Sequence, residues 1–480
     1  MTASPLELAG ARVLVLGLGV SGRAAAEVLA ARGAEVTTVD DGAQDADAPS
    51  DAPGLLEGAD LVVTSPGWAP SHPLLAGALA AGIPVWSEVE LAWRSRAPRP
   101  GGSFAPWLAV TGTNGKTTTV GMLEAILRAA GERAEAVGNV GTPVVAAVQD
   151  PLTEVFAVEL SSFQLHFTHS MAAQAAAVLN VAPDHIDWHG SLEAYAGDKG
   201  RIFERVEVAC VYTVADPRTR ELVEDADVAE GARAVGITLG TPGPGELGVI
   251  DELLVDRSFH AELDAFGRHD SAAELGSLAD LEHLAGPDGR LAPHVVANAL
   301  AAAALARAHG VSAQAVRDGL RSFAPGAHRI ETVARVDGVS FVDDSKATNA
   351  HAAAASLASF EPGTVVWVAG GLAKGADFDE LVSSRRDRLR AVVVIGVDAE
   401  GLLGALERHA AEVPVTRIDP GDTDKVMDRA LDAARRFALP GDTVLLAPAG
   451  ASMDQFRSYA HRGEEFTRAA LALPGAEAAR

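Results

Sequence analysis

The chain has little lysine, although it is well supplied with arginine. Only five of its 39 basic residues are lysines. Lysine carries a compact amine that can lose its proton, whereas arginine carries a planar and permanently charged guanidinium group. Lys116, Lys199, Lys346 and Lys374 lie in short motifs rich in Gly, Asp or Thr, while Lys425 lies in an ordinary Asp-rich helical stretch. We interpret the four as candidates for chemistry that needs an amine; a compositional bias that left a few lysines at random is the alternative.

Cysteine is also scarce, and long apolar runs are lacking. Cys210, in the run VEVACVYTV, is the single cysteine, so an internal disulfide is excluded. This usage fits a reducing compartment and a buried strand position for Cys210. No uninterrupted apolar run approaches the roughly 20 residues of a spanning helix. The N-terminus MTASPLELAG lacks a basic region. We therefore expect a cytoplasmic protein without a membrane partner.

An excess of basic charge is lacking as well, because the formal net charge is −26. A surface that binds nucleic acid or an anionic membrane needs positive charge. We expect no nucleic-acid partner, and any phosphate ligand must be held by local groups. A chain of 480 residues is too long to fold around one hydrophobic core. Chains of this length divide into domains of about 100 to 200 residues each.

Short Val- and Leu-rich runs alternate with Ala-rich stretches along the whole chain, as in RVLVLGLG, WLAVTGT, VFAVELS, VVWVAGG and TVLLAPAG. This alternation predicts strand–helix units, and hence an α/β fold of parallel sheets covered by helices on both faces. Ser95–Pro106, rich in Pro, Gly and Arg, is typical of a linker, and a second break falls at Phe323–Gly326. The acidic, Gly-rich segment Asp264–Arg290 is weakly periodic, and we expect a loop insertion there.

These breaks predict three domains. They are a Rossmann-like N-terminal domain at 1–96, a central P-loop ATPase-like parallel-sheet domain at 97–325 and a C-terminal Rossmann-like domain at 326–480. Ligands of open parallel sheets bind at the carboxyl ends of the strands. Polar motifs that follow predicted strands are therefore the candidate site residues.

The first such motif is VLVLGLGVSGRAAAE, in which Gly17, Gly19 and Gly22 form the pattern G-x-G-x-x-G between a strand and a helix. Such glycines let the backbone approach a diphosphate, and the helix N-terminus stabilises its charge. Asp40 ends the next predicted strand, where an acidic residue can bind a ribose or a base edge. A dinucleotide, a nucleotide sugar and a merely tight turn all stay open. Further on, TSPG places Gly67 after a strand end, where it could form a lip for the same ligand; an ordinary Pro/Gly turn is the alternative.

The second motif, AVTGTNGKTTTV, places residues 112–117 between a strand and an amphipathic helix. Successive backbone N–H groups and the helix N-terminus cradle phosphates in such loops. Lys116 would reach the terminal phosphates, and the Thr117 hydroxyl can bind Mg²⁺. The loop is shorter than the commonest phosphate-loop pattern, but its strand–helix context predicts a nucleotide site.

Polar side chains follow two further strands. Glu159 ends VFAVE, and Asn180, Asp184 and His185 come after AAVLNV. Carboxylate and imidazole groups facing a phosphate loop suit Mg²⁺, which binds few protein oxygens together with phosphates and water. Lys199, in YAGDKGRIF, is the odd member of this group, because an ammonium repels a cation. A structural role is the alternative for His185, and equally for His189 a few residues later.

Three more motifs lie in the last third of the chain. DDSKATN, at 343–349, contains Lys346 and follows a strand, and Arg329 in GAHRIE precedes it. VAGGLAKG contains Lys374, and APAGASMDQ contains Ser452. Each motif alone could be a turn. Together they indicate a third group of polar residues at strand ends, where ligands bind.

The order of these motifs resembles that of the Mur ligase family of peptidoglycan synthesis, over essentially the whole chain. GTNGKTTT is similar to the phosphate loop of the family in general. TSPG with His72 and Pro73, DDSKATN, and GASMDQFRSYAHRG resemble the members that add D-glutamate. The resemblance implies an ATP-dependent ligase that joins D-glutamate to UDP-N-acetylmuramoyl-L-alanine through an acyl phosphate. It implies ATP and Mg²⁺ as cofactors, with two metal sites, and we expect a monomer.

The resemblance also implies roles for individual residues. The ATP site would comprise Gly112, Thr113, Asn114, Gly115, Lys116, Thr117, Thr118, Asn298, Arg329 and Asp344. The metal ligands would be Thr117, Glu159, His185 and Lys199. Lys199 matches a lysine that the family carbamylates with CO₂, and a carbamate is an anion, which resolves its oddity. The substrate site would comprise Ser21, Gly22, Asp40, Gly67, Asn139, Thr348, Lys374, Ser452 and Tyr459, and the catalytic residues would be Lys116, His185, Lys199 and Lys346.

Three other functions stay open at this point. An NAD-linked oxidoreductase would use the glycine motif, and a nucleotide-operated binding switch would use the phosphate loop without turnover. Another ligase of the same superfamily would differ only in the amino acid added. Because the ligands of a ligase would lie on different domains, we also expect the third domain to close and exclude water from the acyl phosphate.

Overall fold

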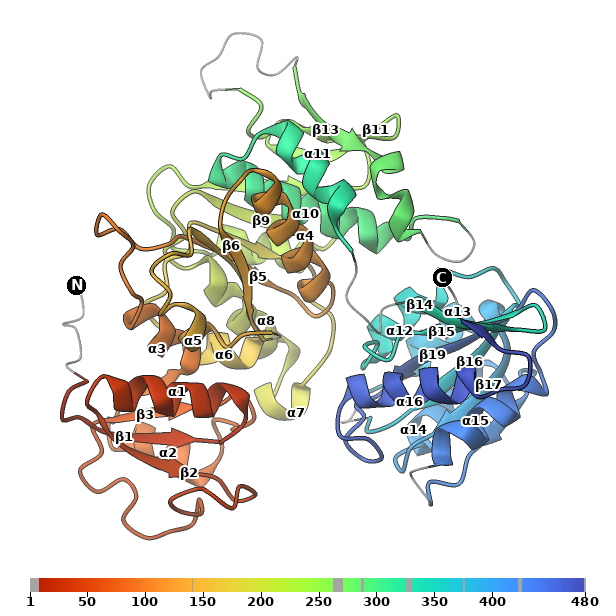
Figure 1. Cartoon of the computed structure of the whole chain (residues 1–480), viewed down its shortest axis with the longest axis horizontal. Helices are drawn as coiled ribbons and strands as arrows, with labels where there is room; N and C mark the ends of the chain where they lie inside the picture. The colour runs from red at the N-terminus through yellow and green to blue at the C-terminus, as the bar shows by residue number, and fades with distance from the viewer. Residues whose placement is uncertain are drawn as a thin grey trace. The chain divides into compact units, whose positions relative to one another are not determined.

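The computed structural model describes residues 8–139, 141–261, 271–285, 289–324, 330–373, 376–421 and 425–478. In these residues strands and helices alternate and build three β-sheets of four, nine and seven strands (Figure 1). The predicted α/β class is therefore confirmed. The first of two compact units holds the four- and nine-stranded sheets, and the second holds the seven-stranded sheet. No helix within the described ranges is long and apolar enough to cross a membrane.

The N-terminal sheet is parallel, with the strand order β2-β1-β3-β4. Its strands are β1 (Arg12–Leu16), β2 (Glu35–Val39), β3 (Leu61–Thr64) and β4 (Val85–Ser87). Its helices are α1 (Val20–Ala31), α2 (Pro73–Ala80) and α3 (Glu88–Arg94). Two of them begin at capping side chains, since His72 Nδ1 accepts the Leu74 N–H and Ser87 Oγ accepts the Glu90 N–H. These caps satisfy amides that a first helical turn leaves unpaired.

The central sheet has the order β13-β12-β11-β10-β9-β8-β5-β7-β6. Its strands are β5 (Trp107–Thr111), β6 (Ala134–Gly138), β7 (Val155–Glu159), β8 (Ala175–Val178), β9 (Ala209–Thr213), β10 (Arg233–Ile237), β11 (Glu246–Ile250), β12 (Leu253–Asp256) and β13 (Ala273–Ser277). Its helices are α4 (Lys116–Ala129), α5 (Val144–Ala147), α6 (Ser162–His166), α7 (Ile186–His189), α8 (Leu192–Gly200), α9 (Pro217–Glu224), α10 (Pro293–His309) and α11 (Ala313–Ser322). Cys210 is buried in β9, as predicted, and burial raises the pKa of its thiol to about 12.

One edge of the central sheet departs from the prediction. β12 is antiparallel to both of its neighbours, β11 and β13, although the sequence pattern predicts a parallel sheet. β11 and β12 are joined by Asp251 and Glu252, whose φ angles are 47° and 69°. Two such residues make a tight hairpin turn, which usually carries asparagine or glycine and so escapes notice here.

The predicted loop insertion at Asp264–Arg290 is also corrected. Its described part contributes β13 and a 3₁₀ helix at Leu278–Leu284. β13 is a five-residue strand that includes Gly276, so its own sequence gives little strand signal. Pairing with β12 and packing against α11 determine its conformation instead.

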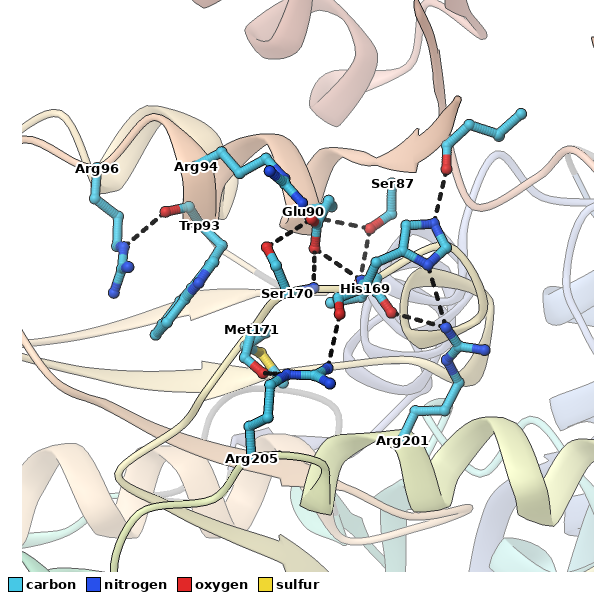
Figure 2. A network of polar contacts seen from close by, with 12 residues as sticks. Ser87, Glu90, Trp93, Arg94, Arg96, His169, Ser170, Met171, Arg201 and Arg205 are labelled. Atoms are coloured by element: carbon cyan, nitrogen blue, oxygen red, sulfur yellow. Dashed lines mark hydrogen bonds and ion pairs between the residues drawn. The ribbon is translucent and has the colours of Figure 1, made fainter. Parts of the chain in front are cut away.

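A buried polar network around α3 joins the first two sheets (Figure 2). The side chain of Glu90 is 0% exposed. Its carboxylate accepts the N–H groups of His169 and Ser170, each at 2.8 Å, and the Ser170 hydroxyl at 2.6 Å. Arg94, one turn later on α3, donates its Nε–H to the same carboxylate. Burial acts to raise the pKa of Glu90, but these hydrogen bonds outweigh it and hold the pKa below its usual value.

Glu88, two residues earlier on α3, has the opposite electrostatic environment. Its Oε1 accepts a hydrogen bond from Gln164 Nε2 at 2.7 Å. Its Oε2 is buried and has no hydrogen-bond partner in the part of the chain that the structure describes. Burial raises the pKa of Glu88, although the bond from Gln164 opposes the shift. The same short helix therefore carries one charge-stabilised carboxylate and one that burial drives toward its neutral form.

The C-terminal sheet has the order β18-β17-β16-β19-β15-β14-β20. Its strands are β14 (Glu331–Val336), β15 (Val339–Asp343), β16 (Val365–Gly370), β17 (Leu389–Ile395), β18 (Val415–Arg417), β19 (Thr443–Ala449) and β20 (Glu477–Ala478). Its helices are α12 (Ala350–Leu357), α13 (Asp379–Arg385), α14 (Glu400–His409), α15 (Val426–Arg435) and α16 (Tyr459–Leu471). β14 is antiparallel to β15 and β20, and the other pairs are parallel. Separate hydrophobic clusters around Trp367 and Phe341 form its core.

Candidate active site

The candidate nucleotide site lies where β5 ends and α4 begins. Gly112 and Gly115 have φ angles of 154° and 87°, which glycine adopts without steric cost. Asn180 fixes the loop between them: its Oδ1 accepts the Asn114 N–H at 2.9 Å, and its Nδ2 donates to the Asn114 carbonyl at 3.1 Å. The sequence grouped Asn180 with candidate metal ligands, whereas here its amide shapes the loop. The loop opens a 14-residue helix, whose N-terminus favours anions.

Two of the four motif lysines meet at this loop. Lys116 Nζ donates to the carbonyl oxygens of Gly112 and Thr113, at 2.8 and 3.0 Å. Lys199 Nζ donates to the carbonyl oxygen of Gly112 at 3.0 Å, although Lys199 comes from α8. Lys199 is 1% exposed and lies 4.4 Å from the centre of the Tyr195 ring. The hydroxyls of Tyr195 and Thr113 share a hydrogen bond of 3.1 Å, which couples α8 to the loop again.

Glu159 ends β7, which pairs with β5, and it lies opposite Val110 in that pairing. The residue is 2% exposed, and Asn139 Nδ2 donates to its Oε1 at 3.1 Å. A predicted metal ligand and a predicted substrate residue are thus in direct contact. Among the described residues, no three His, Cys, Asp or Glu side chains group into a ready-made metal site. A cation bound by Glu159 would therefore take part of its oxygen ligands from phosphate or water.

Helix α10 brings Asn298 to the phosphate loop. A Cβ atom added to Gly115 would lie 2.5 Å from Asn298 Oδ1, so the side chain packs directly on the loop backbone. Asn298 is 6% exposed. Thr117 and Thr118 occupy the first turn of α4, on the same loop. The structure therefore places the predicted ATP residues of the central sheet around one loop.

His185 belongs to residues 182–187, which form part of the second compact unit. Its φ angle is 52°, a left-handed conformation that costs a residue with a side chain about 1 kcal/mol. His185 Nε2 lies 3.6 Å from Asp184 Oδ2, and the same oxygen accepts a hydrogen bond from Asn349 Nδ2 at 3.1 Å. Strain of this kind is found at functional residues. Lys199 lies in the first unit, and its action together with His185 stays a prediction.

The glycine motif of the N-terminal sheet forms a close-packed turn. A Cβ atom on Gly22 would lie 1.8 Å from the carbonyl oxygen of Gly17, so only glycine fits there. Ser65 Oγ donates to that same carbonyl oxygen at 2.9 Å. Asp40 Oδ2 accepts the N–H of Leu18 at 2.7 Å, and this backbone hydrogen bond is the largest cause that lowers the pKa of Asp40. Asp40 therefore organises the glycine loop itself.

The other two predicted residues of this site lie nearby in the fold. Ser21 is partly buried in the first turn of α1. Gly67 is exposed in the turn after β3, and a Cβ atom there would meet no atom within 4 Å. Trp68, beside it, reaches back to Gly17, where its Nε1 would lie 2.8 Å from an added Cβ atom. The space at Gly67 suits the predicted lip of a ligand site.

A buried arginine ties together the motifs of the C-terminal sheet. Arg462 is 1% exposed, and its guanidinium donates to the Ser345 hydroxyl at 3.0 Å and to the Ser345 carbonyl at 2.9 Å. It also donates to the Gly450 carbonyl at 3.0 Å. The Ser345 hydroxyl in turn donates to the Tyr459 carbonyl at 2.7 Å. Burial lowers the pKa of Arg462 to about 10, which leaves it charged at neutral pH. The sequence interpretation passed over this arginine.

The other predicted residues of this unit surround the same motif. Lys346 Nζ lies 5.4 Å from the centre of the Tyr459 ring. Asp344 and Ser452 are largely buried at the ends of β15 and β19. The N–H of Thr348 donates to the Lys346 carbonyl at 2.9 Å. The predicted residues Arg329 and Lys374 lie outside the described residues.

A glycine-rich loop that carries lysine and threonine at the start of a helix, after a buried parallel strand, defines a nucleotide-binding α/β protein. Comparison with known families gives the particular group. The family model of the Mur ligase middle domain matches residues 110–306, and that of the Mur ligase glutamate ligase domain matches residues 328–450. The chain belongs to the Mur ligase family.

Relatives of high identity span nearly the whole chain. The UDP-N-acetylmuramoylalanine–D-glutamate ligase of Streptomyces avermitilis is 57% identical over 479 residues, which cover 97% of this chain and 98% of the relative. The protein of the same name from Thermobifida fusca is 51% identical, over 98% of this chain and 100% of the relative.

Solved structures of much lower identity share the fold. A murein peptide ligase from Psychrobacter arcticus matches with a TM-score of 0.54 at 17% identity, over 96% of this chain and 98% of that chain. The UDP-N-acetylmuramate-alanine ligase of Thermotoga maritima matches with a TM-score of 0.54 at 16% identity, over 95% of this chain and 98% of that chain. At these identities the likeness shows the three-domain fold alone.

Proposed function

We propose that the protein is an ATP-dependent ligase that joins D-glutamate to UDP-N-acetylmuramoyl-L-alanine, in the cytoplasmic synthesis of peptidoglycan precursors. Relatives that carry the corresponding name are 57% and 51% identical to nearly the full chain. The structural observation that carries the proposal is the meeting of Lys116 and Lys199 at the Gly112 carbonyl. Lysines gathered at one phosphate loop suit a reaction between a triphosphate and a carboxylate, which repel each other.

The reaction has two steps, because a carboxylate is a poor acylating agent. A carboxylate oxygen of the L-alanyl group attacks the γ-phosphorus of ATP, a new O–P bond forms, the bond to the bridging oxygen breaks, and ADP leaves. The neutral amine of D-glutamate then attacks the acyl carbon. A C–N bond forms, the C–O bond to the phosphate breaks, the amine loses a proton, and inorganic phosphate leaves. Lys116 would turn from the loop carbonyls to the terminal phosphates and offset the charge that develops there.

The residues beside the loop fit Mg²⁺, since the Thr117 hydroxyl and the buried Glu159 carboxylate are hard oxygen ligands. Bound Mg²⁺ would supply positive charge that stabilises the transferred phosphoryl group. Lys199 would contribute as a carbamate: its ammonium first loses a proton, the neutral amine adds to CO₂ with a new N–C bond, and a second proton leaves. The two steps convert a cation into an anion with two oxygen ligands. His185 would be the second protein ligand of that site.

We propose that the ligands divide among the predicted domains. Residues 1–96 would bind the UDP group, 97–325 would bind the ATP phosphates and the muramoyl group, and 326–480 would bind D-glutamate and complete the ATP site. In that scheme the UDP contacts are Ser21, Gly22, Asp40 and Gly67, and the muramoyl contact is Asn139. The contacts to adenine, phosphate and ribose are Asn298, Arg329 and Asp344, and the D-glutamate contacts are Thr348, Lys374, Ser452 and Tyr459.

Phosphate release by the purified protein tests the proposal. With ATP, Mg²⁺ and UDP-N-acetylmuramoyl-L-alanine, we expect continuous release only when D-glutamate is added. L-glutamate, meso-diaminopimelate and D-alanine are expected to be inactive in its place, and activity with one of them would assign another ligase of the superfamily. UDP-N-acetylglucosamine is expected to compete with the substrate while NAD has no effect, because the glycine motif binds UDP. ATP binding without any turnover would indicate a switch and overturn the proposal.

A further inference from the structure

A buried hydrogen-bonded cluster centres on His189, which ends α7. Its Nδ1–H donates to Asp198 Oδ2 at 2.8 Å, because a carboxylate can only accept, and its Nε2 accepts the Ser162 hydroxyl at 3.0 Å. His166 Nδ1 donates to the same carboxylate at 2.9 Å. The His189 side chain is 0% exposed and that of Asp198 is 11% exposed. The proposed reaction assigns no role to any member of this cluster.

The members of the cluster stand next to predicted metal ligands in the sequence. Ser162 begins α6, three residues after Glu159, and Asp198 directly precedes Lys199 on α8. Successive residues of a helix point about 100° apart. Asp198 therefore anchors one side of α8, while Lys199 leaves from another side and reaches the phosphate loop. The two hydrogen bonds of His189 set the separation between α8 and the start of α6.

The aromatic rings packed around His189 favour a role in holding neighbouring helices and side chains in position. The ring stacks on Phe163 at 5.4 Å, and Trp188 and Tyr195 lie 4.4 and 5.1 Å from it, measured between ring centres. The order Ser162, His189, Asp198 is also that of a hydrolase triad. Ser162, however, is 3% exposed beneath these rings, so a substrate cannot reach its hydroxyl. Tyr195, which touches both His189 and Lys199, extends the cluster to the amine.

We propose that His189 and Asp198 are positioning residues for the metal-binding lysine. They hold α8 against the start of α6, so that a carbamate on Lys199 would stay beside the phosphate loop. The inference rests on the proposed function, since it concerns the same metal site. Residues that orient metal ligands in this way affect metal affinity or activity by about 10- to 100-fold.

The test compares His189→Asn with a matched control, His309→Asn. His309 also lies in the first unit, is 14% exposed, and has both ring nitrogens bonded, to Gln174 at 2.6 Å and to Glu132 at 3.0 Å. Carbamate is measured by ¹³C NMR with ¹³CO₂, and cation binding by the EPR signal of Mn²⁺ with ATP. For His189→Asn we expect lower carbamate occupancy and about 10-fold weaker Mn²⁺ binding. The KM for D-glutamate is expected to stay unchanged, and His309→Asn to match the wild type in all three measurements.

A second variant, Asp198→Asn, carries the test if His189→Asn does not fold. It keeps the side-chain shape and is expected to shift carbamate occupancy and Mn²⁺ affinity in the same direction. The double variant is expected to be no worse than the poorer single variant, because the two residues act as one unit. An active, carbamylated wild type beside single variants with unchanged carbamate and Mn²⁺ binding overturns the positioning role alone. An inactive wild type overturns the proposed function instead.

Discussion

Lys116 and Lys199 donate hydrogen bonds to the same atom, the carbonyl oxygen of Gly112, at 2.8 and 3.0 Å. They approach it from different helices, α4 and α8. Two ammonium groups that share one acceptor repel each other. Conversion of Lys199 to a carbamate would remove this repulsion and leave Lys116 as the cation for the phosphates. The pair therefore gives a physical reason for the modification that the family resemblance implies.

Small carboxylates added to the solution should restore part of the activity that is lost with the Lys199 amine. We expect Lys199→Ala to lower kcat about 100-fold or more, because the proposed carbamate ligand of the metal is lost. Formate, acetate or propionate should restore part of the rate by placing a carboxylate in the vacated space. Lys425→Ala, which removes the lysine outside the motifs, is the control and should keep full activity. A folded Lys199→Ala protein that no carboxylate rescues would count against the carbamate.

Gly115→Ala should separate the cost of a positive φ angle from the effect of a side chain that presses on Asn298. Gly115 and Gly131 have nearly equal φ angles, 87° and 89°, but only at Gly115 would a Cβ atom meet a side chain, Asn298 Oδ1 at 2.5 Å. Both alanine variants should lose about 1 kcal/mol of unfolding free energy from the backbone conformation. Only Gly115→Ala should also lose ATP affinity, measured by calorimetry. Equal ATP affinity in the two variants would show that the Asn298 contact does not shape the site.

The phosphate loop and the glycine motif could be predicted from sequence because both depend on local chemistry. Positive-φ glycines between a strand and a helix leave a recognisable pattern, and the structure places both where the pattern does. The contact of Lys199 with Gly112 could not be predicted in this way, since the two residues are far apart in the chain and meet only through the fold. Arg462 was missed for the same reason: its partners Ser345 and Gly450 come from other strand ends.

The edge strand β13 was missed because pairing, and not its own pattern, defines it. The hairpin before it turns on Asp251 and Glu252, residues without the usual turn signature. The different environments of the two carboxylates of α3 could not be predicted either. Nothing in SEVELAW distinguishes Glu88 from Glu90, and the difference comes from the segment that packs against them.

Glu90→Gln should make the free energy of unfolding depend less on pH in the acidic range. The folded-state pKa of Glu90 lies below its usual 4.5, so the carboxylate contributes stability above that pH and loses it as the pH falls through the folded-state value. We expect the variant to lose about 2 to 4 kcal/mol at pH 7, because donors would face an amide. The difference from wild type, measured by urea unfolding, should shrink below pH 4.5. A difference that is the same at all pH values would contradict the charged state of Glu90.

Glu88→Gln is the matched comparison on the same helix, because the pKa of Glu88 is shifted in the opposite direction from that of Glu90. Burial raises the pKa of Glu88 above its usual 4.5, so ionisation costs stability as the pH rises from 4.5 through the folded-state value. Glutamine resembles the neutral acid and cannot ionise. We expect the variant to be within about 1 kcal/mol of wild type at low pH and to gain relative stability at high pH. A loss that grows with pH would contradict the inferred burial of a neutral acid.

Arg462→Ala should disturb the motifs around Ser345 and Gly450 in the C-terminal unit and leave the phosphate loop of the central sheet unchanged. Its side chain holds Ser345 and Gly450, so its loss leaves two buried carbonyl oxygens unpaired, at a cost of about 1 to 3 kcal/mol each. We expect the KM for D-glutamate to rise more than the KM for ATP. Arg468→Ala, on the same helix but 46% exposed, is the control and should change neither. Equal effects on both KM values would show that Arg462 serves general stability.

The central claim is that the carboxylate of the substrate is activated by phosphorylation. UDP-N-acetylmuramoyl-L-alanine labelled with ¹⁸O in its alanyl carboxylate tests this directly, by mass spectrometry of the products. The two-step reaction predicts ADP together with inorganic phosphate that carries one ¹⁸O atom from that carboxylate. Inorganic phosphate without the label, formed while D-glutamate is joined, would contradict an acyl phosphate and with it the mechanism.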